Sequence, residues 1–328
     1  MRILVCFGTR PEYIKVKSII SKIKNITTCF IGQHTTLLQN IQTDFVINIS
    51  DESNNRLNNI IINILKNNHI FNNIDYVLVQ GDTTTALGIA ISAFNNQKKI
   101  IHLEAGLRTY SSLDPYPEEM NRQLISRIAN IHLCPTLNNK QNLLNENIKE
   151  DNIFIVGNTG LDNISKDNCL YENIVLITIH RRNNIEIVKE WFTEFEKLAN
   201  QYSNVRFILP LHPNPEIQTH KNIFNNVEVI DPIEHIKLIE ILKKCKCVIS
   251  DSGGIQEECS FLNKKIIICR ENTERPEILG KHGILCPKPE ELSEIFKNII
   301  INYEINDSCP FGDGNAYKKI QNIFHELK

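Results

Sequence analysis

The stretch "CVISDSGGIQEECSFLNKKIIICRE", residues 247–271, contains the elements that decide the fold. An apolar run ends in the small residues of "DSGG", a helical pattern follows, and a second apolar run, "KIIIC", comes after it. Short apolar runs on both sides of a helical segment predict parallel strands joined by a helical crossover. This stretch therefore predicts an α/β fold.

The turn within this stretch is a candidate anion-binding site. Ser252, Gly253 and Gly254 would place backbone N–H groups at the positive end of the helix, where a diphosphate binds favourably. Glu258 follows about one turn into the helix, where it would accept hydrogen bonds from ribose hydroxyls. The alternative is a structural glycine turn followed by solvated glutamates.

The same alternation of apolar runs and helical patterns extends through the chain. We expect a first domain over residues 1–171 and a second over 172–308, because the pattern restarts after the polar stretch "SKDNCLYEN". Open α/β sheets bind ligands at the carboxyl ends of their strands. Two such sheets facing each other would share an interdomain cleft as the active site. The runs that predict strands are "RILVCF", "TTCFIG", "YVLVQG", "KKIIHLE", "IHLCPT", "IVLITIH", "VRFILPLH" and "VEVID".

Composition is that of an ordinary soluble globular protein and excludes several classes. The 328 residues carry a formal net charge of −2 with scattered basic residues, so no polybasic patch indicates nucleic acid or a membrane surface as a partner. No apolar run approaches the roughly 18 residues that span a bilayer. The ten cysteines are dispersed, and several lie in apolar runs, which favours reduced structural thiols. We expect a cytoplasmic protein.

Charged residues follow the first predicted strand. In "FGTRPE", Gly8 forms the turn, Arg10 stands at its edge and Pro11 takes the first helical position, where its missing N–H costs nothing. Arg10 and Lys15 would face a phosphate. A capped helix with surface cations is the alternative.

Acidic residues follow two further strands of the first domain. "QGDTTT" places Asp82 before a run of threonines that would cap a helix, and Asp82 itself could be only a cap. "HLEAGLRTYSSLDPYPEEMNRQ" ends an isoleucine-rich strand in Glu104 and then supplies Glu118. Ionised carboxylates are rarely buried without a partner or a task. We therefore interpret Asp82, Glu104 and Glu118 as candidates for acid/base chemistry.

Cationic side chains follow the strands of the second domain. "TIHRRNN" supplies His180, Arg181 and Arg182, whose charge would complement a diphosphate. "LPLHPNP" and "RENTERPE" add His212 and Arg275 at further strand ends. No Gly-x-Gly-x-x-Gly follows the first strand and no Walker lysine motif occurs, which argues against NAD and ATP chemistry. The pattern favours acid/base work on a nucleotide-activated substrate.

Seven motifs, in order and over essentially the whole chain, resemble the non-hydrolysing UDP-N-acetylglucosamine 2-epimerases. The resemblance implies two Rossmann-like domains of the glycosyltransferase B type, a homodimer, a UDP-sugar substrate, and no cofactor or essential metal. It also implies that the terminal segment, residues 309–328, carries a helix that returns to the first domain. The motifs are "FGTRPE", "GDTTT", "HLEAGLRT", "PYPEEMNRQL", "HRRNN", "DSGGIQEE" and "TERPE".

The reaction implied by the resemblance inverts C2 of a UDP-2-acetamido sugar. UDP is eliminated across C1–C2 to give a 2-acetamidoglycal and is then added back with protonation on the other face. Motif matching assigns proton handling to the three carboxylates, without deciding which is base and which is acid. The resemblance also implies that Lys15 supports catalysis and that Glu258 binds the ribose. It implies a catalytic role for His180 as well. The residues implied to bind the diphosphate are Arg10, Arg122, His180 and Ser252.

The chain departs from the family pattern at several positions. It is shorter than typical members, with trimmed loops after the first helix and around "DFVINISDESNN", and Asn183 replaces the usual glutamate after "HRR". A UDP-6-deoxy-L-hexosamine substrate and hydrolysis to the free sugar therefore stay open as alternatives. So do a glycosyltransferase of the same fold and a catalytically silent UDP-sugar-binding protein.

The resemblance also implies a second, effector site for the UDP sugar. "GQHTTLL" supplies Gln33 and His34, and His212 would complete the site from the second domain. The alternative is that Gln33 and His34 cap the following helix. Because Thr36 and the shortened loop near Ser50 remove expected polar contacts, we expect weak coupling between the two sites.

Overall fold

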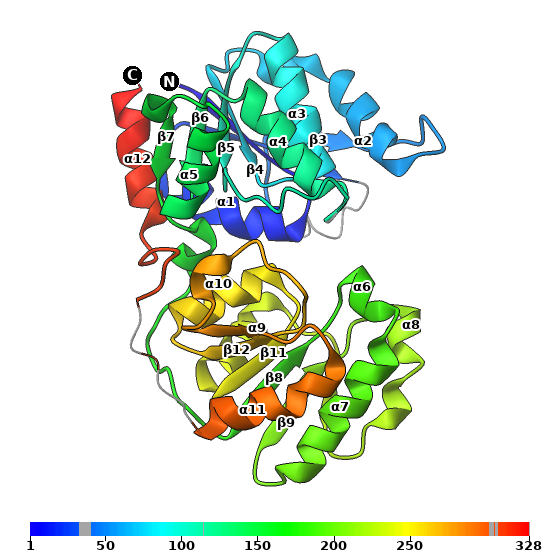
Figure 1. The fold of residues 1–328 in the computed structure, drawn as a ribbon. Helices are drawn as coiled ribbons and strands as arrows, with labels where there is room; N and C mark the ends of the chain where they lie inside the picture. The colour runs from blue at the N-terminus through cyan, green and yellow to red at the C-terminus, as the bar shows by residue number, and fades with distance from the viewer. Residues whose placement is uncertain (33–40, 114, 302–304, 306–307, 328) are drawn as a thin grey trace. The chain divides into compact units, whose positions relative to one another are not determined.

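The chain forms two compact units in the computed structural model, which describes residues 1–32, 41–113, 115–301, 305 and 308–327 (Figure 1). The first unit comprises Met1–Asn163 together with Phe311–Lys328, and the second comprises Ile164–Pro310. None of the described helices is long and apolar enough to cross a membrane.

The border between the units lies at residue 163, whereas the sequence predicted it at residue 171. The polar segment between these positions contacts the second unit. The backbone N–H of Leu170 donates to the carbonyl of Lys243 at 2.9 Å. The ammonium group of Lys264 binds the carbonyl of Leu170 and lies 4.0 Å from the ring centre of Tyr171. These contacts place the segment with the second unit.

The first unit contains a seven-stranded sheet among the described residues, and every strand pair is parallel. The strand order is β3-β2-β1-β4-β5-β6-β7, so β1, β4 and β5 lie side by side at its centre. Strands buried on both faces read as continuous apolar runs. The strands are β1 (Ile3–Phe7), β2 (Ile26–Gly32), β3 (Phe45–Asn48), β4 (Tyr76–Gln80), β5 (Lys99–Leu103), β6 (Ile131–Cys134) and β7 (Ile153–Ile155).

Helices cover both faces of this sheet. One face packs against α2 and α3, with Ile64 and Ile89 in the core beside Val77. The other packs against α1 and the terminal helix α12, which brings Ile320 and Phe324 into the first unit (Figure 1). The helices are α1 (Arg10–Lys22), α2 (Arg56–Leu65), α3 (Thr84–Asn95), α4 (Glu118–Ile128), α5 (Leu137–Asn145) and α12 (Ala316–Glu326), with short 3-10 turns at Asn68–Phe71, Glu150–Asn152 and Thr159–Asn163.

The second unit contains a six-stranded parallel sheet among the described residues, in the order β10-β9-β8-β11-β12-β13. The central strands β8 and β11 are neighbours, so the loops that follow them are neighbours as well. The strands are β8 (Ile174–Thr178), β9 (Arg206–Pro210), β10 (Glu228–Ile230), β11 (Cys247–Ser250), β12 (Lys265–Ile268) and β13 (Gly283–Leu285).

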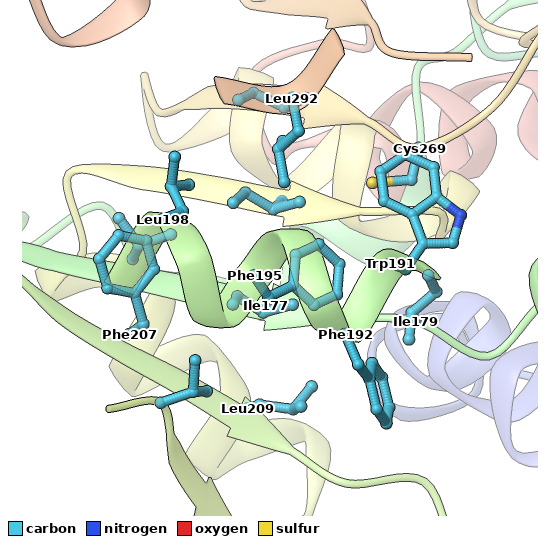
Figure 2. Packing of buried hydrophobic residues seen from close by; sticks show 14 of the residues in the cluster. Ile177, Ile179, Trp191, Phe192, Phe195, Leu198, Phe207, Leu209, Cys269 and Leu292 are labelled. Carbon is cyan, nitrogen blue, oxygen red and sulfur yellow. The ribbon is translucent and has the colours of Figure 1, made fainter. Parts of the chain in front are cut away.

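An aromatic core covers one face of the second sheet. Figure 2 shows Trp191 and Phe195 of α7 packed beside Ile177 of β8, with Leu292 of α11 in the same cluster. Trp191 is fully buried, and its indole N–H donates to the side-chain oxygen of Asn184 at 3.2 Å. The helices of this unit are α6 (Arg182–Ile185), α7 (Val188–Gln201), α8 (Pro215–Gln218), α9 (His235–Lys244), α10 (Gly253–Phe261) and α11 (Leu292–Ile301), with 3-10 turns at Lys221–Ile223, Pro276–Ile278 and Pro289–Glu291.

The predicted fold class, two Rossmann-like domains, is confirmed, and the predicted strands and helix starts differ in detail. Three edge strands were not predicted: β3, which lies in the trimmed loop "DFVINISDESNN", β7 at the other edge of the first sheet, and β13 at an edge of the second sheet. Each is only three or four residues long and has one neighbour, so it leaves little periodicity to detect. Helix α1 begins at Arg10, one residue before Pro11. Eight of the cysteines are buried free thiols.

Candidate active site

In the first unit, the loops after β1, β4 and β5 lie next to one another because these strands are neighbours. Glu12 joins the first two loops. Its carboxylate accepts hydrogen bonds from the N–H of Gly8 at 3.0 Å and from the hydroxyl groups of Thr9 and Thr83, both at 2.7 Å. Glu12 is 2% exposed, and burial raises the pKa of its carboxyl group although these hydrogen bonds oppose the shift. This buried carboxylate fixes the position of Thr83, directly after Asp82.

A buried histidine fixes the other side of Asp82. The Nε2 atom of His102 donates to the carbonyl of Gly81 at 2.8 Å. Burial lowers the pKa of His102 to about 3, so the ring is neutral near pH 7. His102 therefore has a positioning role in the loop that carries Asp82.

Glu104 follows β5 and forms an ion pair. Its carboxylate lies 3.0 Å from the ammonium group of Lys15 and also binds the side-chain amide of Gln80. Glu104 has a φ of 64°, the left-handed region that non-glycine residues rarely adopt. Backbone strain of this kind is concentrated at functional sites, where surrounding contacts maintain it. The structure thus brings together two residues predicted for catalysis, Lys15 and Glu104.

Asp82 is paired with a buried arginine. The Nε atom of Arg122 lies 3.1 Å from the carboxylate of Asp82, and its Nη1 atom lies 3.8 Å from Glu119. Glu119 is fully buried and accepts hydrogen bonds from the backbone N–H groups of Thr109 and Tyr110. Burial opposes ionisation of Glu119, but these bonds and the Gln123 amide outweigh it and lower the pKa. Arg122 therefore contacts two carboxylates, and its predicted contact with diphosphate stays a prediction.

Two predicted residues of the first unit lie at helix starts. Glu118 is the first residue of α4 and is half-buried, and its carbonyl accepts a hydrogen bond from Arg122 at 3.4 Å. Arg10 is the first residue of α1 and is exposed. Both side chains are therefore open to a ligand.

In the second unit, the amino terminus of α10 has the geometry of an anion site. Ser252 precedes the helix, and its N–H donates to the hydroxyl of Ser250 at 3.0 Å. A Cβ atom at Gly253 would lie 2.5 Å from the guanidinium of Arg275, so only glycine allows this approach. A Cβ atom at Gly254 would meet nothing within 4 Å. The start of α10 is therefore open on the side of Gly254 and cationic on the side of Gly253.

Three arginines surround one buried carboxylate near this helix start. Glu274 is 6% exposed and lies 2.7 Å from Arg270, 2.9 Å from Arg275 and 3.2 Å from Arg181. Burial would raise the pKa of Glu274, but the guanidinium groups, Arg275 foremost, hold it well below its usual range. Arg275 also binds the buried Glu257 at 2.7 Å. The cluster therefore holds three guanidinium groups against two carboxylates, Glu274 and Glu257, and the one positive charge in excess suits an anion.

Asp251 holds the loop after β8. The carboxylate accepts hydrogen bonds from the backbone N–H groups of His180 and Arg181 at 3.0 and 2.9 Å and from the side-chain amide of Asn184 at 3.0 Å. It also lies 3.1 Å from Nδ1 of His180. Burial opposes ionisation, but His180 and the N–H donors lower the pKa of Asp251. A carboxylate on Nδ1 fixes the ring orientation of His180, leaving Nε2 for a ligand.

Two further predicted residues complete the second unit. His212 is exposed, and its ring stacks on that of His180 with centres 6.2 Å apart. Partial burial and the neighbouring His180 lower the pKa of His212. Glu258 lies on α10 and contacts His235, with Nε2 of the histidine 2.7 Å from Oε1 of the glutamate.

The structure places the predicted residues in two groups, one in each unit. Gln33 and His34 lie outside the described residues. No group of three or more histidine, cysteine, aspartate or glutamate side chains is arranged to hold a metal ion in the described part of the chain. Sequence reasoning missed the residues that hold the site residues in place, although "RPE" and "TERPE" contain two of them. Those missed are Glu12, His102, Glu119, His235, Asp251, Arg270 and Glu274.

The sheets and these two groups define a two-domain α/β protein of the glycosyltransferase B type with an acidic and a cationic half. The sequence profile described as UDP-N-acetylglucosamine 2-epimerase matches residues 20–325. The chain belongs to the UDP-N-acetylglucosamine 2-epimerase family, which confirms the predicted resemblance.

Individual relatives match over the full length. The UDP-N-acetylglucosamine 2-epimerase of Neisseria meningitidis serogroup A is 34% identical and covers 98% of each chain. That of Salmonella borreze is 32% identical, covering 100% of this chain and 99% of the relative. A crystal structure of the UDP-GlcNAc 2-epimerase from Neisseria meningitidis bound to UDP-GlcNAc superposes with a TM-score of 0.89 at 33% identity, covering 99% of this chain and 100% of that one.

Proposed function

We propose that the protein inverts C2 of a UDP-2-acetamido sugar, converting UDP-N-acetylglucosamine to UDP-N-acetylmannosamine. The observation that carries the proposal is the pair of carboxylates at the ends of adjacent strands, Asp82 after β4 and Glu104 after β5, each held by a cation. The family match and the cationic helix start in the second unit support it.

The proposed chemistry has two balanced steps. A carboxylate removes the C2 proton while the bond from C1 to the diphosphate oxygen breaks, which yields UDP and a 2-acetamidoglycal. The diphosphate then attacks C1 again, and a second acidic group delivers a proton to the opposite face of C2. Elimination and re-addition give a product at the same oxidation state as the substrate. The two steps therefore require no oxidant or reductant.

The residue roles follow from charge and position. Asp82, Glu104 and Glu118 are the proton-handling groups, and Lys15 holds Glu104 through its ion pair. The N–H groups at the start of α10, with Arg181 and Arg275 nearby, would hold the diphosphate as it leaves and returns. With its Nδ1–H directed at Asp251, the imidazolium form of His180 would donate from Nε2 to the diphosphate, whereas Nε2 of the neutral ring would only accept.

The test is NMR spectroscopy of the purified protein with a panel of UDP-2-acetamido sugars in D2O. The expected result is inversion at C2 with deuterium at C2 of the product. Product that keeps the original hydrogen would refute the elimination route. Release of UDP with a free sugar would identify a hydrolase, and turnover of only the 6-deoxy-L-hexosamines would change the substrate.

The partner and compartment are also proposals. We propose a homodimer, supported by large apolar side chains exposed on α4 and the loop before it, among them Leu113 at 75% and Leu124 at 48%. We propose the cytoplasm as its compartment, which the buried free thiols fit. Light scattering at several protein concentrations tests the dimer, and a mass of about 38 kDa throughout would contradict it.

A further inference from the structure

The open face of α10 runs from Gly254 to Glu258. These residues are four apart and so lie on the same side of the helix, about 6 Å apart along its axis. The residues between them, Ile255 to Glu257, are buried. A ligand whose diphosphate sits at the helix start would therefore place its next group beside Glu258.

The two oxygens of Glu258 have different surroundings. Oε1 lies 2.7 Å from Nε2 of His235. Oε2 is buried and has no hydrogen-bond partner among the described residues. An ionised carboxylate only accepts hydrogen bonds, so His235 must present its Nε2–H to Oε1. The second oxygen is left for a donor that the described part of the chain does not supply.

His235 is well placed to hold this arrangement. It is the first residue of α9, on a different element from Glu258, and its side chain is 24% exposed against 13% for Glu258. Glutamate has three side-chain torsions, so a free Glu258 would sample several positions. The hydrogen bond from His235 restricts these positions and leaves Oε2 as the oxygen without a partner among the described residues.

We propose that His235 is a positioning residue for nucleotide binding, which holds Glu258 so that its second oxygen accepts a hydrogen bond from a ribose hydroxyl. The inference rests on the proposed function, because it requires a nucleotide on α10. It predicts an effect on affinity that passes entirely through Glu258.

The experiment is a double-mutant cycle measured by calorimetry with UDP as the probe. His235→Phe removes the N–H donor while keeping the ring volume, and His235→Gln retains a donor at similar reach. Lys237→Ala, an exposed position on the same helix, is the matched control. We expect UDP to bind about three- to tenfold more weakly to His235→Phe, and within about twofold of wild type to the other two.

The kinetic readout separates positioning from general structural damage. His235→Phe should raise KM for the UDP sugar while kcat stays within about twofold, because the proton-handling groups are on the first unit. In a Glu258→Ala background the same histidine change should have no further effect on UDP affinity. A His235→Phe loss that persists in that background, or no loss at all, would overturn the inference.

Failure of the proposed function gives a different result. If Glu258→Ala alone binds UDP as tightly as wild type, then no ribose contacts Glu258 and both the nucleotide placement and the role of His235 are wrong. If Glu258→Ala weakens UDP binding at least tenfold while His235→Phe does not, the nucleotide placement stands and only the inference falls. Thermal unfolding of each variant checks that it is folded, and His235→Ala replaces His235→Phe if the larger ring is not accommodated.

Discussion

Glu12 in the first unit and Glu274 in the second are both buried carboxylates, yet their pKa values shift in opposite directions. Glu12 is surrounded by neutral donors, two hydroxyls and a backbone N–H, and burial raises its pKa. Glu274 has three guanidinium groups against it, and they lower its pKa despite burial. Burial alone therefore does not set the charge of a carboxyl group, because its partners decide which form is stable.

The same contrast separates the candidate site residues of the first unit from those of the second. The first unit pairs two of the three predicted proton-handling carboxylates with one cation each, Asp82 with Arg122 and Glu104 with Lys15. The second unit collects an excess of positive charge beside a helix start. We infer that the first half handles protons and the second holds the anion that leaves and returns.

The largest expected effect tests that division directly. Asp82→Asn and Glu104→Gln keep the shape but remove proton-handling capacity, so each should lower kcat by about 10² to 10⁴. UDP affinity, measured by calorimetry, should stay within a few-fold of wild type. Loss of UDP affinity in step with kcat would show that the two halves do not divide the work in this way.

The next effect is on stability in the second unit. Glu274→Gln leaves three guanidinium groups without their shared carboxylate, and we expect about 3–5 kcal/mol of destabilisation at pH 7 in urea unfolding. Because the folded pKa of Glu274 is lowered, its contribution is present above the unfolded pKa of about 4.3. This contribution to stability is lost as the pH falls toward and through the folded pKa. The difference in unfolding free energy between Glu274→Gln and wild type should therefore become smaller in acid.

Glu228→Gln is the control for this experiment. Glu228 pairs with Arg206 on the surface, with side chains 46% and 62% exposed. Exposed ion pairs contribute little, so this variant should unfold within about 1 kcal/mol of wild type. Equal losses of unfolding free energy in Glu274→Gln and Glu228→Gln would mean that the buried cluster stabilises the fold no more than a surface ion pair.

A smaller effect is expected at Asp251, whose ion-pair partner is His180. Asp251→Asn would present an amide to backbone N–H groups that need an acceptor, costing about 1–3 kcal/mol of stability. It would also release the ring of His180 from its fixed orientation. Nitrogen-15 NMR of His180 should then show a mixture of tautomers, where the wild type shows one with Nδ1 protonated.

The smallest effect, with the opposite sign, is expected at Glu12. Glu12→Gln can keep the hydrogen bonds, since its amide oxygen replaces one carboxylate oxygen and its NH2 donates to the hydroxyl of Thr83. The raised folded pKa means that ionising Glu12 opposes folding at pH values above it. Glu12→Gln should therefore be as stable as wild type or slightly more so at pH 7, and no more stable at pH 4. A large loss of stability in Glu12→Gln at pH 7 would contradict the opposite pKa shifts of Glu12 and Glu274.

How much the sequence predicted depends on whether a feature is local. Asp82, Glu104 and Ser252 follow apolar runs directly, so their place at strand ends could be read without knowing the sheet order. Asp251 lies beside Ser252 in the sequence, but its partner His180 follows β8 and lies 71 residues earlier, and only the pairing of β8 with β11 joins them. The contact of His235 with Glu258 depends on how α9 and α10 pack together. The apolar pattern of the sequence does not predict that packing.

The terminal helix has a consequence for the order in which the protein folds. The second unit is one continuous segment, residues 164–310, whereas the first needs residues 311–328 to cover its sheet. During synthesis the second unit can therefore finish folding before the first, although it is made later. Until α12 arrives, Ile3 and Val5 lack part of their core, and we expect a chain truncated after residue 310 to unfold its first unit in less urea while the second keeps its midpoint. Folding of the second unit can therefore precede completion of the first, which is the reverse of the order of synthesis.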